Sequence, residues 1–208
     1  MPELMTVPEP LTRALLELSE RLATCPDLWL VGGSSGLLLQ DVNIGSVPRD
    51  LDVYMDEPSG AAHLLLKDAA LDQPEFSRTE QYRSTLSHYS LHGVTVELVA
   101  GFEVRAPGAH YTVRIREQAA ALAPRYALGG RTVLLMPLAH ELLFNMLRNR
   151  PDRYTAIAEA IKRDRETHLP AVGALLKGSD FDEAWTRRVG GLLGVTAREL
   201  LGEADSHA

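Results

Sequence analysis

The chain is poor in cysteine and has fewer basic than acidic residues. Its one cysteine, Cys25, excludes an internal disulfide and any metal site built from several cysteines. Because Cys25 follows an apolar helical pattern, we expect it to be a small buried residue. With 28 acidic and 21 basic residues, the formal net charge is −7. This balance disfavours a broad basic surface for nucleic acid, although it is compatible with a local basic patch.

Long apolar runs are also missing. No run approaches the roughly 18 residues of a membrane-spanning helix. The N-terminal sequence MPELMTVPEP lacks the basic and then apolar pattern of a secretion signal. Hydrophobic residues make up 45% and charged residues 24% of the chain, which is ordinary for a globular protein. We therefore expect a soluble, cytoplasmic protein with no membrane partner.

The periodicity of apolar residues changes near Pro137. Before it, helical and extended patterns alternate, and a glycine pair at 129–130 marks a turn. After it, only helical patterns follow, separated by Pro151, Pro170, Gly178 and Gly194. The sequence predicts an α/β (α+β) core over residues 9–136 and a helical region over 137–203 that packs on it. The expected helices are 11–22, 37–40 and 59–71, and the expected strands are 28–31, 50–55, 85–91, 94–99 and 111–115.

Two carboxylates share one face of a predicted strand. Asp50 and Asp52 alternate with apolar Leu51 and Val53, so their Cα atoms lie roughly 6.6 Å apart on the same side. Like charges this close repel, and each is costly to bury without a compensating cation. A divalent metal with oxygen ligands is the simplest compensation. The competing structural reading is a solvated edge strand whose carboxylates pair with Arg49.

A glycine- and serine-rich turn, residues 32–36 (GGSSG), lies between the strand 28–31 and the predicted helix 37–40. A phosphate-binding P-loop requires a lysine after its second glycine, and none is present. The dinucleotide-binding pattern G-x-G-x-x-G fails because position 31 is Val. The turn does match G-x-S-x-G, which would make Ser34 a hydrolase nucleophile with His140 or His168 as base. That alternative leaves Asp50 and Asp52 without a role.

A third acid lies on a later strand, where Glu97 interrupts the β-branched run 94–99. An apolar strand, a Gly-Ser turn, Asp-x-Asp on the next strand and a distant carboxylate together resemble the DNA polymerase β-type nucleotidyltransferase superfamily. The residues around GGS and DLD are similar to those of CCA-adding enzymes and of aminoglycoside- or toxin-type nucleotidyltransferases. The resemblance covers residues 28–100. It departs from the family pattern in the long gap between Ser34 and Asp50 and in having Glu as the third acid.

The resemblance implies a nucleotidyltransferase fold, with a small mixed β-sheet flanked by helices. It implies transfer of a nucleoside monophosphate from a nucleoside triphosphate to an acceptor hydroxyl, with release of pyrophosphate. Two Mg²⁺ ions, or Mn²⁺, would be held by Asp50, Asp52 and Glu97, and Glu97 would help to deprotonate the acceptor. The residues expected to bind the nucleotide, for which ATP is the default, are Gly32, Gly33, Ser34 and Ser35.

The acceptor is not specified by these motifs. The acidic balance slightly favours a small molecule over tRNA or a protein, and the long loop 41–49 is the first place to look for acceptor contacts. Arg83 and His88 are candidates for facing the acceptor. Arg83 or Arg105 has the alternative role of pairing with Glu97. A further set of candidates for contacting the nucleotide consists of Arg148, Arg150 and Arg153.

A non-catalytic member of the same fold is the second hypothesis. Such a protein would bind a nucleotide or a protein partner, as in a toxin–antitoxin-like pair. Loss of one carboxylate would be the usual sign of it, and here all three acids are present.

Overall fold

The structure is a computed structural model that describes residues 7–203, and it confirms the expected class, a mixed sheet flanked by helices. The chain divides into two compact units. The first consists of residues up to Glu103 together with Val113–Met136, and the second of Val104–Thr112 together with the chain from Pro137 onward. The expectation had put all of 9–136 in one core. The segment Val104–Thr112 differs because it contains a strand that pairs within the second unit.

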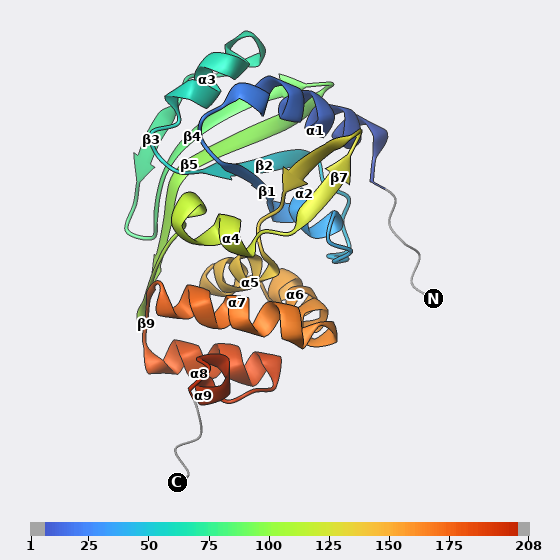
Figure 1. Ribbon diagram of the computed structural model, residues 1–208. Helices are drawn as coiled ribbons and strands as arrows, with labels where there is room; N and C mark the ends of the chain where they lie inside the picture. Colours follow the sequence, from blue (N-terminus) through green and yellow to red (C-terminus); the bar gives the residue numbers. More distant parts are fainter. Residues whose placement is uncertain (1–6, 204–208) are drawn as a thin grey trace. The chain divides into compact units, whose positions relative to one another are not determined.

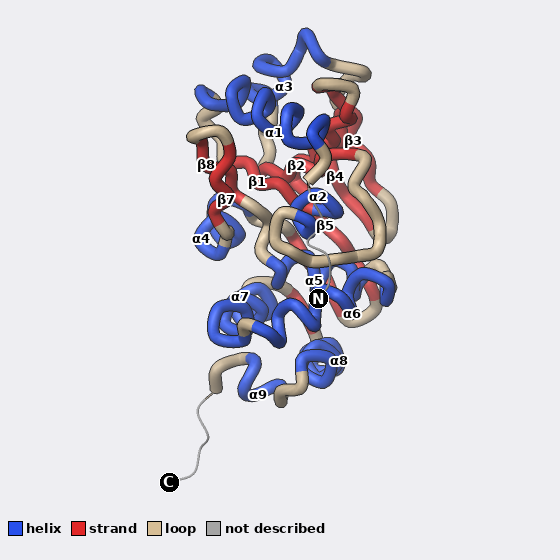
Figure 2. The backbone as a smooth tube through the Cα atoms, turned by 90° about the vertical axis from the view of Figure 1, so that its right-hand side faces the viewer, coloured by secondary structure: helices blue, strands red, loops and turns tan. Residues whose placement is uncertain are grey.

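The sheet of the first unit brings together strands from distant parts of the chain (Figure 2). Its central strand β2 runs antiparallel to β1 on one side and parallel to β5 on the other. The buried residues of β2 and β5, such as Leu51, Val53, Val96 and Leu98, point to the core. The strand order is β1 (Trp29–Gly32), β2 (Asp50–Met55), β5 (Val94–Ala106), β4 (Tyr82–Leu91) and β3 (Glu75–Arg78).

Helix α1 (Glu9–Arg21) forms where the helix 11–22 was expected, and it covers the core (Figure 1). Leu11, Leu15 and Leu18 are buried, and the helix contacts β2 and β4. The 3₁₀ turn η1 (Leu22–Thr24) follows, and Cys25 beyond it is half-buried against the same core. Helix α3 (Gly60–Leu66) and the turn η2 (Lys67–Ala69) complete the helical elements before β3.

Helix α2 (Gly33–Leu38) begins four residues earlier than the predicted helix 37–40. That prediction was wrong because Gly and Ser have weak helix propensity, which tertiary contacts override here. Gly36 shows one such contact: a Cβ there would lie 2.8 Å from the carbonyl oxygen of Val31. The lack of a side chain therefore lets α2 pack closely against β1.

A hairpin formed by β7 (Arg125–Leu128) and β8 (Arg131–Leu134) lies beside β1, with Met136 N–H donating to the Val31 carbonyl at 2.7 Å. Its turn is the predicted pair Gly129–Gly130, with φ of 54° and 79°. Two positive φ angles suit a two-residue hairpin. Neither strand of the hairpin had been predicted.

The expected strand 111–115 is wrong in its second half. Strand β6 (Ala109–Thr112) ends early, and a π-helical turn η3 (Ile115–Ala119) and α4 (Ala120–Leu122) follow. The reason is local capping: the Asp56 carboxylate accepts hydrogen bonds from the backbone N–H groups of Ile115 and Arg116 at 2.8 and 2.9 Å.

The second unit is helical apart from the pairing of β6 with β9 (Asp180–Phe181). Pro170 lies inside α7 rather than between helices, which corrects the prediction. The helix tolerates it because Pro170 is on the exposed face, where its ring does not have to pack and only one backbone donor is lost. No helix in the part of the chain from residue 7 to 203 is both long and apolar enough to cross a membrane. The helices are α5 (Leu138–Leu147), α6 (Pro151–Arg163), α7 (Arg165–Lys177), α8 (Glu183–Leu193) and α9 (Ala197–Leu200).

Candidate active site

The three predicted acids lie on one face of the sheet. In the parallel ladder between β2 and β5, Asp52 is directly opposite Glu97, and Asp50 is opposite Thr95. On the other side of β2, Asp52 pairs with Gly32 of β1. Since residues two apart on a strand share a face, Asp50 and Asp52 both point to the side of Glu97. The structure thus brings the glycine turn and the three carboxylates together in space.

Gly33 lies against Asp52, which belongs to the other half of the motif. Its φ is +59°, and a Cβ at this position would lie 1.8 Å from Oδ2 of Asp52. An L side chain would therefore be strained by the backbone conformation and would also collide with the carboxylate. Position 33 must stay a glycine for Asp52 to keep its place.

The two serines of the turn have different surroundings. Ser35 is fully buried, and its hydroxyl donates to the backbone carbonyl of Asp50. Its hydroxyl therefore ties α2 to β2. Ser34 is half-buried at the second residue of α2, whose N-cap is Gly32. Ser34 is thus not the cap, and of the two serines only its hydroxyl is partly accessible.

Burial raises the pKa of Glu97 above its ordinary value of 4.5, and the nearby negative charge of Asp50 raises it further. The positive charge of His88 acts in the opposite direction and is the smallest of the three effects. The carboxylate cluster is thus electrostatically unfavourable when it is fully ionised. Bound cations would relieve this repulsion.

Arg83 does not pair with Glu97, and Arg49 does not pair with Asp50, in the described part of the chain. Arg83 donates to Glu57 at 2.8 Å and to Glu103 at 3.1 Å. Within residues 7–203 no ion pair joins Arg83 to Glu97, or the exposed Arg49 to Asp50. Arg83 is therefore not available to face an acceptor in the way the sequence had suggested.

His88, the other acceptor-side candidate, is held by a residue that sequence reasoning missed. Asp72 accepts from the backbone N–H of His88 at 2.8 Å, and its second oxygen lies 2.5 Å from Nδ1 of the ring. Asp72 lies in an exposed segment without periodicity, so no sequence signal pointed to it.

The residues required by the hydrolase alternative are unsuited to it. His140 is completely buried, its Nδ1 is 2.8 Å from the Tyr111 hydroxyl, and burial lowers its pKa to about 3. Burial also lowers the pKa of His168. His140 stays inside the core and so cannot take a proton from Ser34, and Ser34 itself lies in a helix rather than at a strained elbow.

Two of the three arginines predicted as nucleotide contacts, Arg148 and Arg150, make local contacts. The guanidinium of Arg148 lies over the ring of Phe144, 4.8 Å from its centroid. Arg150 binds both carboxylate oxygens of Asp152, at 3.0 and 2.6 Å. These contacts account for Arg148 and Arg150 without a nucleotide.

The donor set at the carboxylate face suits a hard divalent cation. Mg²⁺ prefers carboxylate and phosphate oxygens, and it is commonly bound by one or two carboxylates together with substrate phosphates and water. In the part of the chain that the structure describes, no three His, Cys, Asp or Glu side chains converge closely enough to hold an ion by themselves.

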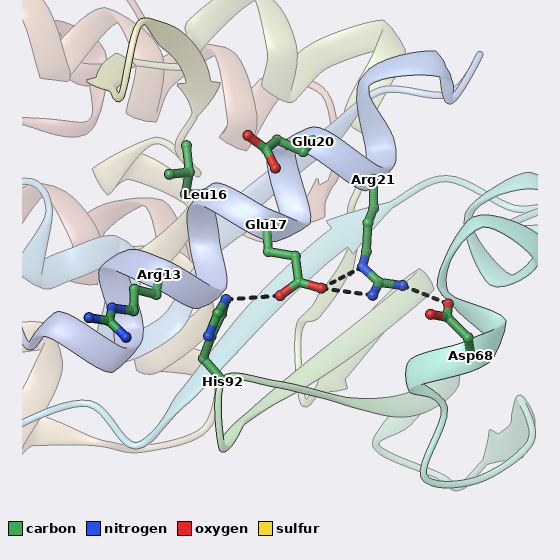
Figure 3. Close-up of a pocket in the computed structure, with 7 residues that line it drawn as sticks. All are labelled: Arg13, Leu16, Glu17, Glu20, Arg21, Asp68 and His92. Carbon is green, nitrogen blue, oxygen red and sulfur yellow. Dashed lines mark hydrogen bonds and ion pairs between the residues drawn. The ribbon is translucent and has the colours of Figure 1, made fainter.

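A separate open groove of about 690 Å³ contains none of the predicted site residues. It lies beside α1, and Figure 3 shows a chain of contacts across it from His92 through Glu17 and Arg21 to Asp68. His92 Nε2 is 2.9 Å from Glu17, and Arg21 is 2.6 Å from Asp68. These ion pairs fasten α1 to the turn between β4 and β5 and to η2.

Comparison with solved structures identifies the architecture. Over 76% of this chain and 96% of the other, the protein superposes on TM1012 of Thermotoga maritima, described as a candidate nucleotidyltransferase, with a TM-score of 0.60 and 18% sequence identity. The chain has the nucleotidyltransferase fold. This confirms the fold expected from the resemblance to the polymerase β-type superfamily.

Two further nucleotidyltransferases are similar less closely. ANT(2″)-Ia, solved with adenylyl-2″-tobramycin, is 10% identical over 80% of this chain and 97% of its own, with a TM-score of 0.48. The lincosamide antibiotic adenylyltransferase LnuA, solved with lincomycin, is 13% identical over 67% and 87%, with a TM-score of 0.42. No protein-family model and no curated protein sequence matches the chain.

Proposed function

We propose that the protein is a metal-dependent nucleotidyltransferase that moves a nucleoside monophosphate from a nucleoside triphosphate to an acceptor hydroxyl, releasing pyrophosphate. The observation that carries the proposal is the position of Asp52 between Gly32 and Glu97 in the sheet. In a nucleotidyltransferase fold, this places the carboxylates beside the turn that would approach the phosphates.

The metal-binding residues would be Asp50, Asp52 and Glu97, with Mg²⁺ the preferred ion and Mn²⁺ a substitute. When bound, divalent ions supply charge neutralisation for the attacking and leaving oxygens. Gly33 leaves room for the Asp52 carboxylate, because a Cβ at position 33 would lie 1.8 Å from Oδ2 of Asp52. The Ser34 hydroxyl and the backbone N–H groups at the start of α2 would donate to phosphate oxygens.

The acceptor follows less directly from the site. The net charge of −7 supports a small molecule over a polyanionic tRNA, since the chain has no excess of basic side chains to hold one. We therefore place a small hydroxyl-bearing molecule first among acceptors, with tRNA and protein side chains behind it.

The test is pyrophosphate release and label transfer. The protein is incubated with Mg²⁺, each α-labelled nucleoside triphosphate, and a panel containing an aminoglycoside, a tRNA transcript, an unfolded protein and water alone. The wild type should release pyrophosphate. The Asp52→Asn variant should release it at least about a hundredfold more slowly, which is the order expected for removing a group that stabilises transition-state charge.

Two outcomes would contradict the proposal. If the wild type binds Mg²⁺ and triphosphate but releases no pyrophosphate, the protein is a non-catalytic nucleotide-binding member of the fold. If Asp50→Asn and Asp52→Asn leave metal-dependent triphosphate binding unchanged, the site lies elsewhere.

A further inference from the structure

His88 and Asp72 form a pair beside the carboxylate face, on the side of Glu97 away from Asp52. The turn between β4 and β5 has two residues, His92 and Gly93, with φ of 50° and 76°. In a two-residue hairpin the flanking residues, here Leu91 and Val94, are opposite each other. Counting back along both strands puts His88 opposite Glu97.

Two observations support this register. Burial alternates in step on the two strands, since Tyr89 and Val96 are buried while His88 and Glu97 are half-buried. The charge of His88 is also close enough to act on Glu97. Directly opposed residues in an antiparallel pair have Cβ atoms about 4.5–5.5 Å apart. The row across this face therefore runs Asp52, Glu97, His88.

Asp72 fixes the orientation of the imidazole. One carboxylate oxygen accepts from the backbone N–H of His88 and the other lies 2.5 Å from Nδ1. The preceding residue, Leu71, donates its N–H to the His88 carbonyl at 2.8 Å, so the exposed segment is fastened to β4 by both Leu71 and Asp72. A carboxylate only accepts hydrogen bonds, which means that Nδ1 carries a proton.

The other ring nitrogen, Nε2, is consequently the basic one in the neutral ring. No described residue hydrogen-bonds it, and the His88 side chain is 30% exposed. A carboxylate that holds the imidazole in one tautomer, with the opposite nitrogen open to a substrate, is the arrangement found in general-base histidines.

We propose that His88 is the general base for the acceptor hydroxyl, and that Asp72 is its positioning residue. This inference rests on the proposed nucleotidyltransferase function. The acceptor O–H proton moves to Nε2 of His88 as the acceptor oxygen forms a bond to the α-phosphorus. The bond from the α-phosphorus to the bridging oxygen breaks, pyrophosphate leaves with that electron pair, and the imidazolium then returns its proton to water. Glu97 is left as a metal-binding carboxylate.

The experiment compares variants in the pyrophosphate-release assay with the panel of acceptors, water included. His88→Gln should lower kcat by about 10²–10⁴-fold, the range for losing a general base. Its KM for the triphosphate and its Mg²⁺-dependent triphosphate binding should stay at the wild-type value, which also shows that the variant is folded. Glu97→Gln, in contrast, should weaken that binding.

Asp72→Asn should lower kcat in the same direction without changing triphosphate binding. Because the two residues act as one unit, the double variant Asp72→Asn/His88→Gln should be no slower than His88→Gln alone. His92→Asn is the matched control. It removes a histidine from the same hairpin, one that pairs with Glu17 in Figure 3, and asparagine tolerates the positive φ. Its kcat should equal that of the wild type.

The outcomes separate this inference from the function on which it rests. The role of His88 would be overturned if the wild type turns over and His88→Gln has the same kcat. It would also be overturned if the kcat losses of the two single variants multiply in the double variant. Either result would leave the nucleotidyltransferase function intact. Absence of transfer to every acceptor by the wild type would overturn both.

Discussion

At position 33 a side chain is excluded for two separable reasons, the backbone conformation and the neighbouring Asp52 carboxylate. Gly45 provides the comparison, since its φ is +72° and a Cβ there would have no neighbour within 4 Å. Both glycines impose the same backbone requirement, but only one of them touches the site.

Gly33→Ala and Gly45→Ala should each lose about 1–2 kcal/mol of stability from the left-handed backbone, with a larger loss at Gly33 from the collision. Only Gly33→Ala should abolish metal-dependent pyrophosphate release. Urea unfolding and the release assay measure the two effects. A Gly33→Ala variant with wild-type turnover would show that Asp52 does not need its present position.

The neighbouring serines should separate stability from binding. Ser35→Ala leaves the Asp50 carbonyl without its buried donor and should cost about 1–3 kcal/mol in the free energy of unfolding. Ser34→Ala should stay within about 0.5 kcal/mol of the wild type. Its triphosphate affinity should fall about tenfold, as expected for a lost hydrogen bond to a charged group. Thermal unfolding measures the change in stability, and calorimetric titration with Mg²⁺ and ATP measures the change in affinity. A stability loss in Ser34→Ala with an affinity loss in Ser35→Ala would show that the two serines have the opposite roles.

At the scale of elements, the parallel pairing of β2 with β5 decides the electrostatics of the site. It puts Glu97 beside Asp52 and near Asp50, and together with burial this raises the pKa of Glu97. A carboxyl whose pKa is higher in the folded than in the unfolded state favours folding while it is protonated. Its contribution is complete below about pH 4.5 and is lost as the pH rises through the folded-state value.

We therefore expect Glu97→Gln to gain stability relative to the wild type as the pH rises from 4 to 8 in buffer containing a chelator. The glutamine cannot ionise, so it avoids the repulsion. Denaturant unfolding at several pH values measures the difference. The advantage should shrink when Mg²⁺ and ATP are added together, and a difference independent of pH would show that Glu97 is not strained by its neighbours.

The sequence predicted those elements whose residues alternate or repeat regularly. The leucines of α1 and the strands that carry Asp50, Asp52 and Glu97 were found because periodicity reports which face is buried. Helix α2 was misplaced, because glycine and serine give no helical signal and tertiary contacts with β1 and β2 select the conformation. The same limit applies to Asp72, whose role depends on a strand distant in sequence.

At the scale of the whole molecule, the net charge of −7 opposes the approach of a free triphosphate. Binding should therefore depend on a divalent cation. Mg²⁺ with ATP at about 100 times the dissociation constant should stabilise the protein by about 2.7 kcal/mol, while ATP with chelator should give no shift. Differential scanning fluorimetry measures both. Asp52→Asn should abolish the Mg²⁺-dependent shift, and an equal shift in that variant would place the nucleotide elsewhere.

The hydroxyl of Ser35 has a consequence for how this chain can change. By holding the Asp50 carbonyl it joins the two halves of the motif directly, so that the residues between them, 41–49, are not needed to keep the halves in register. Most of that loop is exposed, and its ends are already fixed by α2 and β2. Insertions near Gly45 would lengthen the loop without moving the carboxylates. The sequence and length of this loop can therefore change, and acceptor contacts can change with them, without altering the residues that act on the triphosphate.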